Sequence, residues 1–361
     1  MQSDVTYMQQ ALQLARRVQN IVHPNPLVGA VIVKNGTIIG EGAHEEYGGP
    51  HAEVNALIAS TENPTDATMY VNLEPCTYSG KTPPCVPEII RAGLSRVVIG
   101  IQDPNPRVDG KGIHQLREAG IEVKTGVAEN ESREINRGFI HQMNTGLPWV
   151  TLKLALTLDG FIADADGKSQ WITGEQSRQA VHRWRSQHNA IVVGSGTVLI
   201  DDPRLTVRNA EGKNPLRVIL DPERTVSHDA IVLNDGDAET LIVHSRGSTN
   251  GHTKYGAGVH TLVLPENAHN RFEWRELLVK LYEQQGVLSV FVEGGAETAS
   301  SLIHSRLVNE IILFTGPKII GRGLSPFRLL HFPIDEALQV RLIGMHRYDD
   351  DVCLRYRLGE Q

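Results

Sequence analysis

Three side chains of the kinds that zinc prefers lie in the first third of the chain: His51, Cys76 and Cys85. Zinc binds nitrogen and sulfur ligands in a tetrahedron, and three protein ligands leave one position open for water. Bound zinc lowers the pKa of that water toward ~7, so hydroxide becomes available near neutral pH. The pattern predicts a catalytic zinc site, with Glu53 as the residue that carries the proton.

The spacing of His51 and Glu53 requires a particular local structure. Residues two apart point in different directions on a regular helix, so the two side chains can share a site only where a helix begins. Gly48-Gly49-Pro50 breaks the chain just before His51 and supplies that start. Cys76 follows an expected strand, whose end can present a thiolate to a metal.

Other interpretations of these residues stay open. A structural zinc site needs a fourth ligand, for which His44 is the nearest candidate. A His and a Glu at a helix start often only cap the helix, and cysteines are often buried as small apolar residues. A Cys76–Cys85 disulfide is disfavoured, because three cysteines are too few for a disulfide scaffold and the N-terminus lacks the pattern of a signal peptide.

Length and charge narrow the class of protein. The 361 residues predict roughly two domains, each long enough to bury a core. The 35 basic against 42 acidic residues give a net charge of −7, which argues against a nucleic-acid partner. No apolar run approaches the roughly 20 residues that cross a membrane. We expect a cytoplasmic protein with reduced thiols and a small-molecule substrate, and we leave a homo-oligomer open.

Strands that alternate with helices predict an α/β fold with a mixed sheet. Asn144-Thr145-Gly146-Leu147-Pro148 is typical of a linker and divides the chain into domains 1–145 and 149–361. In the first part we expect strands over 27–33, 37–39, 68–73, 96–101 and 121–127, and helices from residue 3 or 4 and over 51–60, 87–92, 113–119 and 131–143. In the second part we expect strands over 149–156, 190–194, 217–220, 240–244, 261–264, 288–292, 310–314 and 352–358, and helices over 176–187, 272–285 and 296–304.

The His-x-Glu and Pro-Cys motifs resemble those of the zinc-dependent cytidine-deaminase superfamily. Eight residues separate Cys76 from Cys85, in place of two, which resembles the long-spaced subfamily that deaminates a pyrimidine intermediate of riboflavin synthesis. Further motifs extend the resemblance to the bifunctional riboflavin-biosynthesis deaminase-reductase family. They are His23-Pro24-Asn25-Pro26-Leu27-Val28-Gly29, His51-Ala52-Glu53-Val54-Asn55, Thr82-Pro83-Pro84-Cys85 and Asp103-Pro104-Asn105-Pro106.

This resemblance implies two reactions and two folds. A cytidine-deaminase-like three-layer domain would use Zn²⁺ to deaminate 2,5-diamino-6-ribosylamino-4(3H)-pyrimidinone 5′-phosphate. A dihydrofolate-reductase-like α/β domain would then use NADPH to reduce the ribosyl chain to ribityl. The resemblance also implies residues that line the pyrimidine and phosphate pocket of the deaminase. They are Asn25, His44, Asn55, Lys81, Asp103 and Asn105.

The second domain carries a further group of candidate residues. The resemblance implies substrate contacts at Ser169, Arg185, Leu205, Arg208 and Glu293, and cofactor contacts at Lys153, Ala155, Trp171, Thr197 and Asp201. Two glycines between an expected strand and helix also suit a phosphate, although such pairs often form an ordinary turn. This segment adds Gly294, Gly295, Ala296, Glu297 and Thr298 as candidate cofactor contacts. Ser245-Arg246-Gly247-Ser248 is a candidate for the 2′-phosphate of NADPH or a simple loop.

Two rival functions remain at this stage. A tRNA or nucleoside deaminase with an unrelated second domain is disfavoured by the net charge of −7 and the long cysteine spacing. A zinc-stabilised interaction protein is disfavoured by Glu53 and by the lack of an evident fourth ligand.

Overall fold

The computed structural model describes residues 3–247, 255–266 and 272–359. The chain divides into two compact units, Met1–Gly146 and Leu147–Gln361. Each unit has its own sheet and its own hydrophobic core.

Over its described residues, the first unit is built on a five-stranded sheet with the order β2-β1-β3-β4-β5. β1 runs antiparallel to both neighbours, whereas β3, β4 and β5 run parallel. The strands are β1 (Gly29–Lys34), β2 (Thr37–Ala43), β3 (Thr68–Leu73), β4 (Arg96–Ile101) and β5 (Glu122–Thr125). The helices are α1 (Asp4–Arg17), α2 (Ala52–Ile58), α3 (Cys85–Arg91), α4 (Lys111–Glu118), α5 (Glu129–Ile135) and α6 (Arg137–Thr145).

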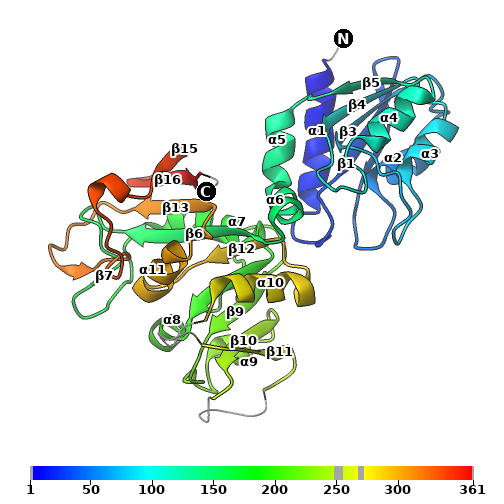
Figure 1. Ribbon diagram of the computed structural model, residues 1–361. Coiled ribbons are helices and arrows are strands. Elements are labelled where there is room, and N and C mark those ends of the chain that lie inside the picture. The colour runs from blue at the N-terminus through cyan, green and yellow to red at the C-terminus, as the bar shows by residue number, and fades with distance from the viewer. Residues whose placement is uncertain (1–2, 248–254, 267–271, 360–361) are drawn as a thin grey trace. The chain divides into compact units, whose positions relative to one another are not determined.

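Helices cover both faces of this sheet, with α1 and α5 on one side and α2, α3 and α4 on the other (Figure 1). The central strands are accordingly short apolar runs that are buried on both faces. Helix α2 lies very close to β2, because a Cβ on Gly42 would come within 2.4 Å of the Ala52 carbonyl oxygen and the Ala56 nitrogen. Glycine is therefore required at this position for α2 to reach the sheet.

Over its described residues, the second unit has a nine-stranded sheet with the order β11-β10-β9-β8-β12-β6-β13-β16-β15. The strands from β11 to β13 run parallel, and β16 and β15 complete one edge in antiparallel fashion. The strands are β6 (Trp149–Leu156), β8 (Ala190–Gly194), β9 (Leu216–Leu220), β10 (Thr240–Ser245), β11 (Val259–Leu264), β12 (Ser289–Val292), β13 (Glu310–Thr315), β15 (Val340–Tyr348) and β16 (Asp351–Leu358), with a separate pair β7 (Ala163–Asp164) and β14 (Gly323–Leu324). The helices are α7 (Glu175–Ser186), α8 (Ser195–Asp201), α9 (Ile231–Asn234), α10 (Trp274–Gln285) and α11 (Ala296–His304), with a 3₁₀ turn at Ile334–Glu336.

Alternation along the central strands decides which side chains face which helix layer. Leu152 and Leu154 of β6 pack in one core with α10 and α11, and Val292 at the end of β12 packs in the same core. The opposite face of the sheet packs against α7, α8 and α9. Lys153 and Glu293, which neighbour these apolar residues in the sequence, therefore point toward the α7 side.

The structure differs from the sequence-based expectations at several elements. The short helices α8 and α9 and the pair β7 and β14 were not expected, and two larger differences have a clear cause. Strand β15 was not expected, because most of its residues are exposed at the sheet edge and show no apolar alternation. Such an edge strand pairs on one side only and needs no buried face. The single helix expected over 131–143 is two helices, α5 and α6, which meet at Asn136. The Asn136 side chain bonds both the N–H and the carbonyl of Leu27, which draws the chain out of one continuous helix.

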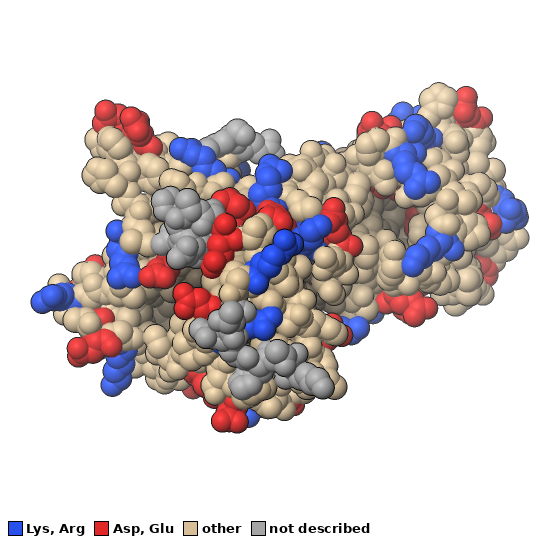
Figure 2. Space-filling model, turned by 60° about the horizontal axis from the view of Figure 1, so that its bottom comes forward, with Lys and Arg blue, Asp and Glu red and all other residues tan. Residues whose placement is uncertain are grey.

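Figure 2 shows Lys and Arg side chains interspersed with Asp and Glu over the face in view. A nucleic-acid strand is held by a continuous basic field, which this mixed face does not present. Among the described residues, no helix combines the length and apolar character that crossing a membrane demands.

Candidate functional site

Three ligand-type side chains meet in the first unit where a strand ends and two helices begin. His51 immediately precedes α2, Cys76 lies shortly after β3, and Cys85 is the first residue of α3. His51 Nδ1 lies 3.2 Å from Cys85 Sγ and 3.4 Å from Cys76 Sγ, and the two sulfur atoms are 3.6 Å apart. One imidazole nitrogen and two thiols at this spacing are a donor set that fits zinc.

The backbone just before α2 explains how His51 and Glu53 share one site. His51 is extended (φ −76°, ψ 163°), and its imidazole makes no capping bond to the helix. The ring is held from its other side by Thr82, whose Oγ1 lies 3.0 Å from Nε2. A hydrogen bond from Nε2 leaves Nδ1 to face the two sulfur atoms, which orients the imidazole for a metal. The sequence pattern placed Thr82 in the loop between the cysteines but assigned it no role.

Glu53 lies in the first turn of α2 and is 3% exposed. Burial, reinforced by the charge of Cys76, raises the pKa of the Glu53 carboxyl to about 7. The two thiols behave as a pair, since hydrogen bonding with Cys85 lowers the pKa of Cys76 to about 4 and raises that of Cys85. A thiolate beside an imidazole attracts a cation, whose charge would displace the remaining thiol proton. A carboxyl next to that cation is placed to move protons.

His44 lies beside this cluster but has both ring nitrogens engaged. Its Nδ1 contacts the Pro50 carbonyl at 3.0 Å, and its Nε2 contacts Asn25 Nδ2 at 2.8 Å. Burial lowers the pKa of His44, which favours the neutral form of the ring. Within the described residues, the ligand-type cluster contains His51 and the two cysteines but not His44, which gives no support to a four-ligand structural site. The cysteines are free thiols and form no disulfide.

The remaining pocket candidates of the first unit lie on three segments around the cluster. Asn55 is on α2 and donates to the Ala43 carbonyl at 2.7 Å. Lys81 is exposed in the loop between the cysteines, with its ammonium 3.9 Å from the centre of the Tyr47 ring. Asp103 and Asn105 follow β4.

The loop after β4 contacts the loop between Cys76 and Cys85. Burial raises the pKa of the Asp103 carboxyl to about 7, and the charge of Cys76 adds to this rise. Asp103 Oδ1 accepts a bond from the Asn105 N–H at 2.8 Å. The Asn105 amide in turn reaches the Tyr78 hydroxyl at 3.4 Å. The predicted pyrimidine contacts therefore lie next to the cysteine loop.

Glu74 organises this region and was missed by the sequence analysis. It is buried directly before Pro75-Cys76, and both carboxylate oxygens accept backbone N–H bonds at 2.9–3.1 Å. The donors are the N–H groups of Asp103, Gly110, Gly112 and Ile113. A charged residue directly after a buried apolar strand was the available signal, because a buried carboxylate must be satisfied by such donors.

The second unit contains a cavity of about 1320 Å³ at the carboxyl ends of its parallel strands. Binding sites in parallel α/β sheets commonly lie at this end, and the volume exceeds that of a site for one small ligand. The cavity lining includes all the candidate substrate and cofactor contacts predicted for this domain except the 2′-phosphate candidate at 245–248. They are Lys153, Ala155, Ser169, Trp171, Arg185, Thr197, Asp201, Leu205, Arg208, Glu293, Gly294, Gly295, Ala296, Glu297 and Thr298.

A buried ion cluster lies in this cavity. Arg185 forms a fork with Glu293 through Nε at 2.6 Å and Nη2 at 3.1 Å, and Lys153 Nζ lies 3.7 Å from the same carboxylate. Burial alone would raise the pKa of Glu293, but the charges of Arg185 and Lys153 outweigh it and lower this pKa to about 2. Arg185 also donates to the Thr206 carbonyl at 3.2 Å. His182, which the sequence analysis missed, places its Nδ1 3.0 Å from the same carbonyl oxygen.

The glycine turn after β12 opens toward the cavity. A Cβ on Gly294 would lie 2.3 Å from the Thr298 side chain, whereas nothing lies within 4 Å of one on Gly295. Glycine lets the turn pack against α11 and leaves the helix start accessible to a phosphate. Ser245 donates to the Pro222 carbonyl at 3.0 Å and, like Arg246, does not line the cavity, while Ser248 lies outside the described residues. The described part of that loop thus gives no support to a 2′-phosphate site.

Comparison with known proteins decides the family. Residues 1–101 match the model of the cytidine and deoxycytidylate deaminase zinc-binding region, and residues 148–354 match that of the RibD C-terminal domain. The riboflavin biosynthesis protein RibD of Aquifex aeolicus is 43% identical over 355 residues, which cover 98% of each chain. The chain belongs to the bifunctional RibD family of riboflavin biosynthesis. The Escherichia coli RibD protein is 40% identical and covers 97% of this chain and 98% of its own.

Solved structures agree with membership in the RibD family. The diaminohydroxyphosphoribosylaminopyrimidine deaminase/5-amino-6-(5-phosphoribosylamino)uracil reductase of Thermotoga maritima is 37% identical, covers 99% of both chains and has a TM-score of 0.89. One crystal form of Acinetobacter baumannii RibD is 36% identical, with a TM-score of 0.86 and the same coverage. The expected α/β fold, with a cytidine-deaminase-like first domain and a RibD reductase domain, is confirmed. So is the expectation of a zinc-dependent deaminase joined to a reductase.

Proposed function

We propose that the first unit, about residues 1–145, deaminates a diaminopyrimidinone ribosyl phosphate, and that the second, about residues 149–361, reduces the ribosyl chain of the product with NADPH. The observation that carries the proposal is the meeting of His51, Cys76 and Cys85 beside the buried carboxyl of Glu53. Membership in the RibD family defines the two reactions, and the geometry supports an assignment of residues to them.

The metal would be held by His51, Cys76 and Cys85, whose donor atoms lie within 4.8 Å of one another. When bound there, zinc supplies the Lewis acidity that makes water nucleophilic near neutral pH. Three protein ligands leave a position open, as in catalytic sites. Thr82 holds the imidazole so that Nδ1 faces the sulfur atoms.

Glu53 is the proton carrier of the deamination. Its carboxyl takes a proton from the attacking water and gives it to the ring amine, which leaves as ammonia. The position in the first turn of α2 supports this role, because it brings the carboxyl beside the ligand set without making it a ligand.

The side chains around the cluster suit a pyrimidine. Amide groups of Asn25, Asn55 and Asn105 can read the amide edges of the ring, and a buried Asp103 can accept from its N–H or amino groups. The exposed ammonium of Lys81 provides a point charge for the phosphate. His44 Nε2 lies 2.8 Å from the Asn25 amide nitrogen, which supports a positioning role for this histidine.

The cavity of the second unit suits the reduction. NADPH supplies the hydride when bound, and the glycine turn before α11 supports placing its phosphates there. The Glu293 carboxylate can accept bonds from ribosyl hydroxyl groups. Because Arg185 is engaged by Glu293, we assign the substrate phosphate to Arg208, whose pKa is lowered by burial and by the charge of Arg185. Arg208 lies near Arg185, and the combined positive charge of the two guanidinium groups attracts an anion.

The thiols support a reducing compartment. Cys76 and Cys85 lie 3.6 Å apart as free thiols, and their oxidation would remove two metal ligands. We therefore place the protein in the cytoplasm, with a small-molecule substrate and without a nucleic-acid partner.

The test is product mass after incubation of the purified zinc protein with the diaminopyrimidinone ribosyl phosphate, with and without NADPH. We expect a deaminated product without NADPH, and a deaminated and reduced product with it. Deamination in both samples without reduction would overturn the assignment of the second unit. Unchanged substrate with zinc bound would overturn the substrate, and deamination of tRNA by the same preparation would then favour the rival assignment.

A further inference from the structure

A buried arginine beneath the cavity is not part of the assignments above. Arg217 lies on β9, its side chain is 1% exposed, and it is among the largest fully buried side chains of the described residues. A guanidinium removed from water must be fully hydrogen-bonded, so its partners show what it holds in place.

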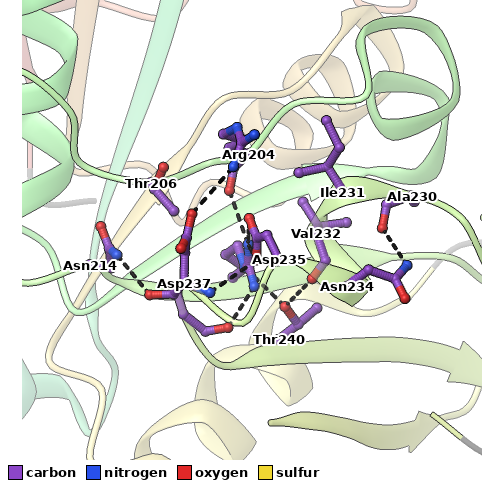
Figure 3. A network of polar contacts seen from close by, with 12 residues as sticks. Arg204, Thr206, Asn214, Ala230, Ile231, Val232, Asn234, Asp235, Asp237 and Thr240 are labelled. Carbon is purple, nitrogen blue, oxygen red and sulfur yellow. Dashed lines mark hydrogen bonds and ion pairs between the residues drawn. The ribbon is translucent and has the colours of Figure 1, made fainter. Parts of the chain in front are cut away.

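The partners of Arg217 come from two segments, the stretch 235–240 and the chain around Arg204. Its Nη1 contacts both carboxylate oxygens of Asp235 at 2.8 and 2.9 Å, and its Nε donates to Thr240 Oγ1 at 2.9 Å. Nη2 donates to the Ala238 carbonyl. Nη1 also donates to the Arg204 carbonyl at 3.2 Å, and Figure 3 shows Arg204, Asp235 and Thr240 gathered around this point.

The Arg204 carbonyl belongs to a short segment that lines the cavity, which we call the 202–208 segment. Leu205, the next residue, has a φ of +55°, a backbone conformation that costs energy for a non-glycine residue. Such a conformation persists only where the surroundings impose it. Leu205 and Arg208 of this segment both line the cavity, and Thr206 contacts Arg185.

Two further bonds attach the same segment to neighbouring parts of the chain. Asn214 Oδ1 accepts from the Val207 N–H at 2.7 Å, while its Nδ2 donates to the Asp237 carbonyl at 2.8 Å. Asp202 Oδ1 accepts from the Ile231 N–H at 2.8 Å. The 202–208 segment thus has backbone anchors to the connection between β9 and β10, with Arg217 as the buried centre.

We propose that Arg217, with Asn214, is a positioning residue of the reductase, which sets the 202–208 segment so that Leu205 and Arg208 meet the pyrimidine substrate. This inference rests on the proposed reduction in the second unit. Neither residue touches the cavity, so both act through the backbone of the segment. The substrate side should therefore depend on them more than the NADPH side, whose glycine turn belongs to a different part of the cavity lining.

The test compares Arg217→Lys and Asn214→Ala with the matched variant Asn234→Ala, all in the full zinc-loaded chain. Asn234 belongs to the same network but bonds only the His228 and Ala230 carbonyls, at 2.6 and 3.0 Å, and does not line the cavity. Lysine keeps a positive charge for Asp235 but cannot make the arginine fork, so this variant avoids an unpaired buried carboxylate. The deaminase rate of each preparation, carried by the other unit, checks that the protein is intact.

We expect Arg217→Lys and Asn214→Ala to raise the reductase KM for the deaminated pyrimidine substrate about five- to tenfold, with the KM for NADPH and kcat within twofold. Asn234→Ala should change all three values less than twofold. Equal changes in the two KM values, or equal changes in all three variants, would show a merely structural role and overturn the inference.

Wild-type turnover separates this inference from the function on which it rests. A wild-type protein that reduces the substrate, with unchanged KM in both anchor variants, would overturn the inference alone. A wild-type protein that deaminates but does not reduce would overturn the reductase assignment and this inference with it.

Discussion

At the scale of single residues, the chemistry of this protein depends on where ionisable groups are buried. Glu53 and Glu293 are both buried carboxyls, but their surroundings have opposite effects on the pKa. Glu53 has a thiolate neighbour, which favours the neutral acid, while Glu293 lies between two cations, which favour the anion. The first environment suits proton transfer, and the second suits a fixed negative charge.

Replacing Glu53 by alanine should separate metal binding from catalysis. The variant Glu53→Ala retains all three ligands, so we expect stoichiometric zinc but a deaminase kcat reduced by about 10²–10⁴. Reduction of supplied deaminated substrate should be unchanged. Metal analysis and the two separate rate measurements check this, with exposed Glu62→Ala as the control. Normal deamination by Glu53→Ala would contradict the proton-transfer role.

The ion cluster around Glu293 predicts a pH dependence of stability. The pKa of this carboxyl is about 2 in the fold against an ordinary 4.5. Because the folded value is the lower one, the carboxylate stabilises the fold above about pH 4.5, and this contribution is lost as the pH falls toward 2. The difference in pKa corresponds to about 3 kcal/mol.

Urea unfolding at several pH values between 6 and 3 measures this contribution. In Glu293→Gln the free energy of unfolding of the second unit should fall less steeply with decreasing pH than in the wild type. The control Glu283→Gln removes an exposed carboxylate paired with Lys280 and should leave the slope unchanged. An identical slope in wild type and Glu293→Gln would show that the cluster does not hold the carboxylate as described.

At the scale of elements, the start of α2 is the feature on which the first site depends. His51 stands outside the helix and Glu53 inside its first turn, which lets both face the cysteines. The close approach of α2 to β2 at Gly42 sets the position of this helix start. The site therefore tolerates little movement of α2 relative to the sheet.

A methyl group at Gly42 tests that dependence. In Gly42→Ala the new Cβ would lie 2.4 Å from backbone atoms of α2, so the helix must shift. Overpacking of this kind costs roughly 1–3 kcal/mol, and we expect deamination and zinc affinity to fall while reduction is retained. Gly247→Ala, where nothing lies within 4 Å of the new Cβ, is the matched control. Full deaminase activity in Gly42→Ala, measured beside calorimetric unfolding, would contradict this account.

At the scale of the whole molecule, each compact unit contains one of the two candidate sites. The residues that we propose as metal ligands belong to the first unit, and the cavity-lining residues belong to the second. Each unit has its own core and sheet. Loss of the bound zinc or of NADPH should therefore affect only the activity of the unit that binds it.

Removal of zinc should inactivate and destabilise the first unit alone. After treatment with a chelator, we expect deamination to stop, reduction of supplied deaminated substrate to continue, and the unfolding transition of the first unit to move to lower temperature. Calorimetry and the two rate assays measure these effects, and re-addition of zinc should reverse them. Parallel loss of both activities would contradict the separation of the two sites.

The amino-acid sequence by itself determined the donor set that fits zinc, the acidic residue that we propose as proton carrier, and most elements of both sheets. These follow from local signals, since the motifs lie at strand ends and helix starts that apolar periodicity already indicates. The edge strand β15 and the break between α5 and α6 could not be predicted, because exposure and the Asn136–Leu27 bonds arise from distant parts of the chain.

Only the tertiary structure decided which side chains support the sites. Thr82 behind His51, Glu74 beneath the Asp103 segment and Arg217 beneath the cavity each act on residues far away in the sequence or in another loop. Their roles follow from burial, because a polar group removed from water must find partners wherever the fold supplies them. The spacing of residues along the chain does not predict those partners.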